Sequence, residues 1–166
     1  MRTLYEVGRI IEDLKKDKER LLERERKISV FSVLDGEDKE DMRPEYDYDS
    51  IKEEIKALDK KIRTLTHSAL KYFVTEKVAE HGDMTLDELL VYLRQLEDKA
   101  DKLYTMSTHL NKERIGTDPI EYEYVNYDIK RVEEEYQKTK KEIDRTKFYT
   151  DFYVYELAFD TGVDGL

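Results

Sequence analysis

Residues 85–110 read TLDELLVYLRQLEDKADKLYTMSTHL, and their apolar side chains recur at alternating steps of three and four residues. This spacing predicts an amphipathic helix. Thr85 and Glu88 have the spacing of a capping box, in which each side chain satisfies a backbone N–H group of the first helical turn. The apolar stripe is wide, so the helix needs other helices to cover it. Its members are Leu86, Leu89, Leu90, Tyr92, Leu93, Leu96, Ala100, Leu103, Tyr104 and Met106.

Seven-residue registers of apolar side chains predict three further long helices. Thr3 and Glu6 form a second capping box, Ser50 and Glu53 form a third, and Asn126 is placed to cap the last helix. Lys18 falls within the first apolar seam, where its ammonium group either extends along the helix to solvent or meets an opposite charge on a partner, and we favour extension to solvent. The expected helices span residues 3–28, 50–72, 85–110 and 127–151.

Four segments are rich in β-branched and aromatic residues and lack a helical period, which favours short strands. They are residues 28–34, 72–78, 120–125 and 152–159. Two of them follow long helices at a similar spacing, which suggests that all four meet in one sheet. We therefore expect one mainly α domain over residues 1–166. It would consist of four long antiparallel helices in a coiled-coil-like bundle, with a small β-sheet at one end.

The composition excludes several classes of protein. The 166 residues are 42% charged with a formal net charge of −10, and acids and bases alternate finely, which argues against a nucleic-acid partner. The absence of cysteine excludes disulfides and thiolate chemistry. Glu6 places a carboxylate where a secretory signal peptide would have its apolar stretch. No apolar run approaches the length of a membrane span. We expect a cytoplasmic protein that does not bind membranes.

The sequence predicts no catalytic, cofactor-binding or metal-binding residues. His67, His81 and His109 lack the Glu-x-x-His spacing of a di-metal bundle, and we expect His67 and His109 on helix surfaces and His81 in a turn. Glycine-rich phosphate loops are absent. Residues 35–49 form an acidic loop with eight carboxylates and two basic residues, but Gly36 directly follows Asp35, unlike the glycine of an EF-hand. An alternative function remains open, in which a metal-dependent hydrolase or nucleotide-handling enzyme uses this loop.

Tyrosine is unusually frequent, with 13 copies, and it is enriched at protein interfaces. Five tyrosines cluster in or near the last two expected strands, where they form either a sheet core or an interface. If they are exposed, the strand edge that bears them invites pairing with a second copy. The candidate interface residues are Tyr122, Tyr124, Tyr127, Tyr153 and Tyr155.

Four segments together resemble the septicolysin-like family of short helical proteins from Gram-positive bacteria and their prophages. They are Tyr46–Asp49, His67–Leu70, Met84–Tyr92 and Glu121–Ile129, and the resemblance extends over nearly the whole chain. It implies a helical fold and a prophage origin. The family's name also implies a membrane-active lysin, which is a second alternative function.

The leading hypothesis is a non-enzymatic helical interaction or scaffold protein. The apolar seams and the tyrosine-bearing strand edge are both surfaces through which such a chain self-associates. We therefore expect a homo-oligomer, and the sequence identifies no other protein partner.

Overall fold

The computed structural model describes residues 1–163 and confirms a mainly α fold with small β-sheets. The chain divides into two compact units. Unit 1 comprises Met1–Tyr72 together with the chain from Val154 onward, and unit 2 comprises Phe73–Tyr153. The expectation that the chain forms a single domain stays a prediction, and each unit is described by itself.

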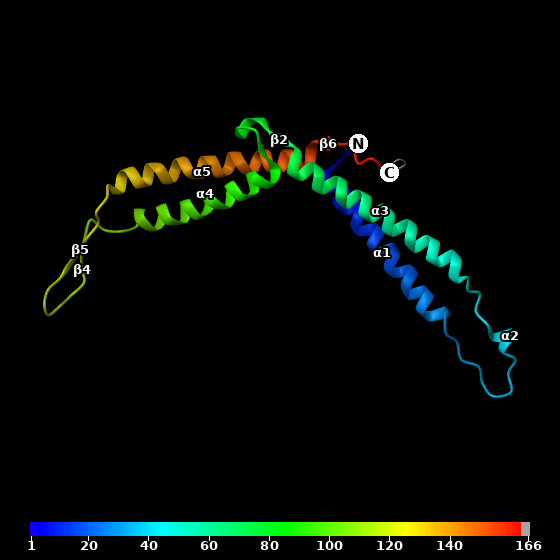
Figure 1. The fold of residues 1–166 in the computed structure, drawn as a ribbon. Helices are drawn as coiled ribbons and strands as arrows, with labels where there is room; N and C mark the ends of the chain where they lie inside the picture. The colour runs from blue at the N-terminus through cyan, green and yellow to red at the C-terminus, as the bar shows by residue number, and fades with distance from the viewer. Residues whose placement is uncertain (164–166) are drawn as a thin grey trace. The chain divides into compact units, whose positions relative to one another are not determined.

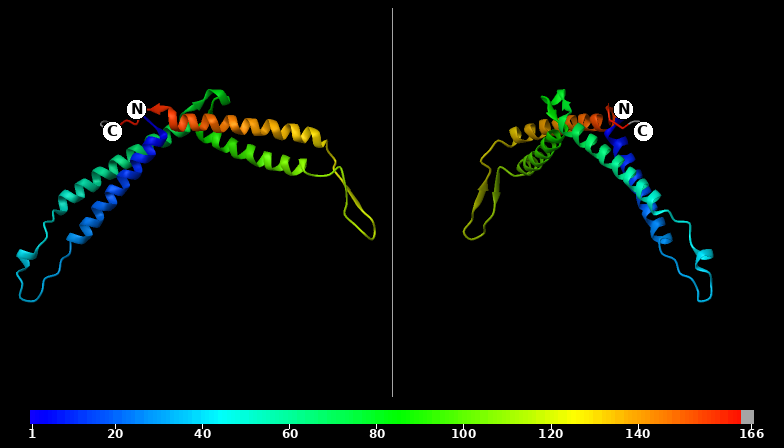
Figure 2. Two further views of the ribbon diagram at one scale, coloured as in Figure 1. Left: turned by 180° about the vertical axis from the view of Figure 1, so that it is seen from behind. Right: turned by 45° about the vertical axis from the view of Figure 1, so that its right-hand side comes forward.

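Unit 1 is built on two antiparallel helices, α1 (Leu4–Ile28) and α3 (Tyr48–Thr75), which lie side by side in Figures 1 and 2. The predicted capping box starts α1: the Thr3 hydroxyl accepts the Glu6 N–H at 3.2 Å, and the Glu6 carboxylate accepts the Thr3 N–H at 3.0 Å. Helix α3 begins earlier than predicted, because the Asp47 carboxylate accepts the N–H of Ser50.

The prediction for Lys18 was wrong. Its ammonium group does not extend alone to solvent but donates to the Asp59 carboxylate of α3 at 2.6 Å. The two side chains remain 31% and 44% exposed, so this ion pair joins the two helices at the edge of their seam. A polar pair of this kind specifies which residues of two helices lie opposite each other.

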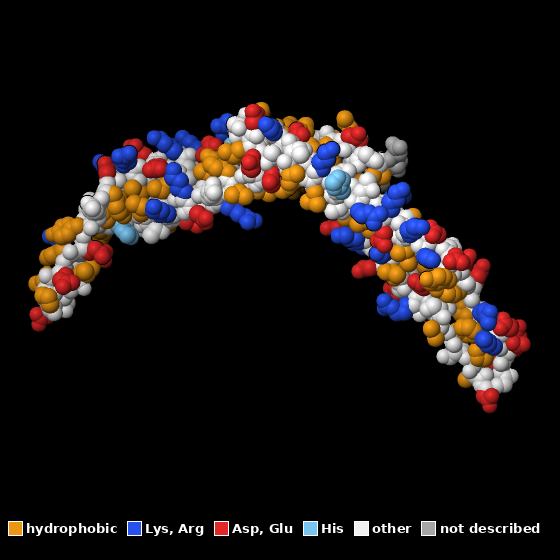
Figure 3. Space-filling model, in the orientation of Figure 1, with side chains coloured by type: hydrophobic (Ala, Val, Ile, Leu, Met, Phe, Trp, Pro, Cys, Tyr) orange, Lys and Arg blue, Asp and Glu red, His pale blue; other side chains and the backbone are white. Residues whose placement is uncertain are grey.

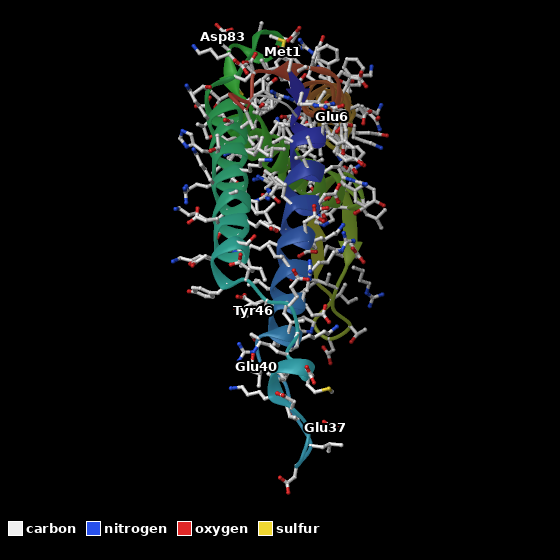
Figure 4. All side chains as sticks on the ribbon, turned by 90° about the vertical axis from the view of Figure 1, so that its right-hand side faces the viewer. Met1, Glu6, Glu37, Glu40, Tyr46 and Asp83 are labelled. Carbon is white, nitrogen blue, oxygen red and sulfur yellow. The ribbon has the colours of Figure 1, made fainter. Side chains whose placement is uncertain are left out.

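The segment between α1 and α3 contains no strand, which corrects the prediction for residues 28–34. Ile28 is the last residue of α1, and residues 29–34 have no partner strand with which to form a ladder. Within the acidic loop the chain forms one short helix, α2 (Lys39–Met42), whose first turn is capped by the Asp38 carboxylate. Figure 4 labels Glu37, Glu40 and Tyr46 in this loop.

Two short strands that are far apart in the sequence pair in unit 1. Strand β1 (Arg2–Thr3) pairs antiparallel with β6 (Ala158–Phe159), with Arg2 opposite Phe159. The Phe159 ring stacks on Tyr72 of α3 at 4.3 Å between ring centres. The prediction of a strand over 152–159 is therefore correct only at its end, because Phe152–Glu156 continues from helix α5 as a π-helical turn, η2.

Unit 2 contains the antiparallel pair α4 (Leu86–Ser107) and α5 (Ile129–Asp151). As predicted, α4 starts at the capping box, where the Glu88 carboxylate accepts the Thr85 N–H at 2.9 Å. Helix α5 is capped by Asp128 and not by Asn126. Leu96, Ala100 and Ile143 form the centre of the core between the two helices.

Within residues 1–163 the strands form three separate two-stranded sheets, whereas the sequence predicted one sheet. In unit 2, β2 (Lys77–Val78) pairs with β3 (Met84–Thr85) around a short 3₁₀ turn, η1 (Ala79–His81). The predicted strand at 72–78 is reduced to its last two residues because α3 continues through Thr75. Strand β4 (Lys112–Arg114) pairs with β5 (Tyr122–Tyr124), which confirms the strand predicted within 120–125.

Candidate protein interface

The segment between α4 and α5 forms a β-hairpin, which we call the ribbon (residues 110–126). Lys112 lies opposite Tyr124, Glu113 opposite Glu123, and Arg114 opposite Tyr122. The chain reverses through residues 115–121, where a Cβ atom on Gly116 would lie 2.6 Å from the carbonyl oxygen of Pro119. The turn therefore needs glycine at this position.

One face of the ribbon combines two cations with two aromatic rings. Because side chains alternate along a strand, Lys112, Arg114, Tyr122 and Tyr124 share this face, which we call the cationic face. The Lys112 ammonium group lies 4.0 Å from the centre of the Tyr122 ring and 5.5 Å from that of Tyr124. Neither Lys112 nor Arg114 forms an ion pair within residues 1–163, so both charges are available to a partner.

The opposite face of the ribbon is acidic. Glu113 and Glu123 lie directly across from each other, and the bond from the Ile115 N–H to the Glu121 carbonyl places Glu121 on the same face. Like charges in opposed positions destabilise a pair of strands. The two faces of the ribbon thus differ in both charge and aromatic content.

Large apolar side chains on the ribbon are open to solvent. All six strand residues are exposed, and hydrophobic side chains gather at the surface of this segment in Figure 3. An isolated two-stranded hairpin is only marginally stable in water, and apolar side chains that face solvent do not stabilise it. The fold of the ribbon therefore does not explain why it exposes large apolar side chains. The exposed fractions are 64% for Leu110, 57% for Ile115, 57% for Ile120, 48% for Tyr122 and 61% for Tyr124.

Tyr127 fixes the base of the ribbon to the end of α4. Its hydroxyl donates to the Met106 carbonyl at 2.8 Å and lies 3.2 Å from Nδ1 of His109. Beside this base is a pocket of about 340 Å³ that Glu113, Glu123 and His109 help to line. Tyr127 is therefore a half-buried anchor of the ribbon and not a freely exposed contact residue.

The five predicted tyrosines differ in exposure. Tyr122 and Tyr124 lie together on an exposed face of the ribbon. Tyr153 is buried in unit 2, where burial and then the nearby Glu80 carboxylate raise its pKa. Tyr155 belongs to unit 1, is 50% exposed, and packs its ring 5.1 Å from that of Tyr5. A buried tyrosine cannot contact a partner, so Tyr153 is excluded from the interface.

Sequence reasoning missed the two cations of this site. The third long helix was expected to end at residue 110, and no strand was predicted at residues 112–114. Lys-Glu-Arg nevertheless alternates with the same period of two as Tyr-Glu-Tyr beyond Gly116. Reading the two triplets as one hairpin would have placed Lys112 and Arg114 beside the tyrosines.

The histidines do not converge. His67 is exposed on α3, as predicted, whereas His109 follows the end of α4. His81 lies in the predicted turn but is buried, and its Nε2 atom lies 3.1 Å from the hydroxyl oxygen of Thr146. Among residues 1–163, no three His, Asp or Glu side chains are grouped so as to hold a metal ion. None of the helices described in this range has the length and apolarity needed to cross a membrane.

Comparisons with known proteins give no family for this chain. No family model and no curated protein matches it, so the resemblance to septicolysin-like proteins stays a prediction. A solved structure of a functionally unknown conserved protein from Corynebacterium diphtheriae is similar over 94% of this chain and 98% of that chain, at 15% identity and a TM-score of 0.46.

Proposed function

We propose that this protein is a non-enzymatic helical interaction protein that self-associates. The observation that supports this most directly is the ribbon, which extends from the end of a helix pair and exposes five large apolar side chains. Exposed apolar clusters with charged neighbours are typical of protein-binding surfaces.

The total exposed surface supports the same proposal. The chain exposes 12,676 Å². Two globular domains of half its 19.9 kDa mass, entirely separate from each other, would together expose about 10,400 Å². The two units thus expose more surface than globular domains of their size, even if they share no contact. Each helix of a pair is covered by its partner on one side only, so the pair leaves surface that association can cover.

The size of the apolar cluster sets the affinity that we expect. Covering the exposed parts of Tyr122 and Tyr124, which share one face of the ribbon, would remove about 200 Å² of apolar surface from water, worth about 5 kcal/mol. The loss of translational and rotational freedom costs about 4–15 kcal/mol. The apolar contact is therefore at most near balance by itself, and the association should depend on concentration.

Light scattering on a sizing column, over a tenfold range of protein concentration, tests this proposal. We expect a mass above 19.9 kDa that rises with concentration. A constant monomer mass over the whole range would contradict self-association.

A further inference from the structure

A ribbon from a second copy is a poor partner for the ribbon. If two β4 strands or two β5 strands paired antiparallel over all three residues, Glu113 would face its own copy or Glu123 would face its own. Both arrangements oppose like charges. Stacking two cationic faces would bring Lys112 and Arg114 of one copy against the same cations of the other. The partner of this face should therefore be an acidic segment with apolar side chains.

The acidic loop of unit 1 has this chemistry. Residues 35–49 contain eight carboxylates and two basic residues. Several of the carboxylates act within the loop: Asp38 and Asp47 cap helices, and Glu40 is paired with Arg43 at 2.9 Å. Others are exposed and form no ion pair within residues 1–163, and they include Asp35, Asp41 and Glu45.

Exposed apolar side chains accompany these carboxylates. Leu34, which directly precedes the loop, is 74% exposed, and within the loop Met42 is 49% exposed and Tyr48 is 57% exposed. The loop therefore matches the cationic face in two independent ways: it has the opposite charge, and it offers apolar surface where the ribbon also exposes apolar surface. Electrostatic complementarity of this kind selects partners and suppresses the alternatives that oppose like charges.

We propose that the cationic face of the ribbon of one copy binds the acidic loop of a second copy, so that the chain associates head to tail. This inference rests on the proposed self-association and names its two surfaces. The contact joins different surfaces of identical chains. One contact leaves a ribbon and a loop free: where these two meet, a two-fold dimer closes, and where they bind further copies, a larger ring or an open chain forms.

Charge reversal on each surface tests the proposal. The ribbon variant combines Lys112→Glu with Arg114→Glu, and the loop variant combines Asp41→Lys with Glu45→Lys. All four side chains are exposed and none caps a helix, so each variant should keep the helix content of the wild type by circular dichroism. We expect each variant to weaken self-association about tenfold or more, measured by light scattering.

Mixing the two variants identifies the partner. The loop variant supplies an intact ribbon and the ribbon variant supplies an intact loop, so equimolar mixing should restore association. A chain that combines all four reversals should also associate, because the opposite charges are exchanged. The ribbon variant changes the formal net charge from −10 to −14 and the loop variant changes it to −6, so general repulsion cannot explain a loss in both.

The acidic face of the same ribbon provides the matched control. Glu113→Gln with Glu123→Gln should leave the mass of the wild type unchanged. If the wild type associates but the loop variant associates equally well, the loop is not the partner and the inference is overturned, while the proposed self-association stands. If the ribbon variant associates like the wild type, the inference is overturned as well. A monomeric wild type would overturn the proposed function itself.

Discussion

The proton on the buried His81 is fixed by its neighbours. The Thr146 hydroxyl has one proton and donates it to the Glu142 carbonyl at 2.7 Å, so its oxygen accepts from the Nε2–H of His81 at 3.1 Å. The Nε2 atom of the imidazole therefore carries a proton. The Nδ1 atom is buried and has no hydrogen-bond partner within residues 1–163, while the ring contacts Tyr149 edge to face. His81 therefore joins the η1 turn to α5 through one hydrogen bond and ring packing.

Removing the acceptor of this bond should destabilise unit 2. Thr146→Val keeps the shape of the side chain but removes the hydrogen-bond acceptor of the buried Nε2–H, which then has only the Glu142 carboxylate 3.6 Å away, and we expect a loss of about 1–3 kcal/mol in the free energy of unfolding. Urea denaturation measures this loss of free energy. Thr105→Val is the matched control, because Thr105 makes the same bond to the carbonyl four residues earlier but is exposed. Equal losses in the two variants would contradict this role for His81.

Two ion pairs connect α4 with α5 and make the stability of this helix pair depend on pH. Lys99 lies 2.8 Å from Glu135, and this hydrogen bond lowers the pKa of Glu135 below its ordinary value of 4.5. Lys147 lies 2.8 Å from Glu97, which raises the pKa of Lys147 above its ordinary value of 10.5. All four side chains are about half exposed, so each contribution is small.

The signs of these contributions are opposite at the two ends of the pH scale. The lowered pKa of Glu135 stabilises the helix pair above pH 4.5, and this contribution is lost as the pH falls through the lowered pKa. The raised pKa of Lys147 stabilises it below pH 10.5, and this contribution is lost as the pH rises through the raised pKa. Urea denaturation across this range should show that Glu135→Gln loses less stability on acidification than the wild type. Identical acid profiles would contradict the assignment.

The ribbon contains a destabilising pair of its own. Glu113 and Glu123 lie opposite each other, so replacing one of them should strengthen the hairpin. We expect Glu123→Thr to increase the opening free energy of the ribbon by about 0.2–1 kcal/mol, since it removes the repulsion and introduces a β-branched residue. Amide hydrogen exchange of residues 112–124 measures this change. Glu134→Thr, at an exposed position of α5, should leave exchange in the ribbon unchanged.

At the scale of the whole molecule, salt distinguishes two electrostatic effects. A chain with a net charge of −10 repels its copies, and screening this repulsion would increase association. If the ribbon instead binds the acidic loop of a second copy, screening weakens that attraction. Raising the salt from about 0.1 M to about 1 M shortens the screening length from about 10 Å to about 3 Å. We expect the mass measured by light scattering to decrease, and an increase would contradict charge attraction as the main force.

The helices were largely determined by the sequence. The apolar period of α4 and the capping boxes at Thr3 and Thr85 are local features, because the groups involved lie within one or two turns of each other. Predicting them requires no information about distant residues, so the first residues of α1 and α4 were predicted closely. The exposure of Tyr122 and Tyr124, by contrast, was left open between a sheet core and an interface.

Tertiary structure decided the strands and the interface. Residues 28–34 and 72–78 have strand-like compositions, but a strand also needs a partner: residues 29–34 have none, and α3 continues through Thr75. The exposure of the predicted tyrosines also depends on tertiary structure: Tyr153 is buried in unit 2, while Tyr122 and Tyr124 are exposed beside Lys112. Burial and strand pairing depend on which distant residues meet, and a periodic pattern in one segment does not contain that information.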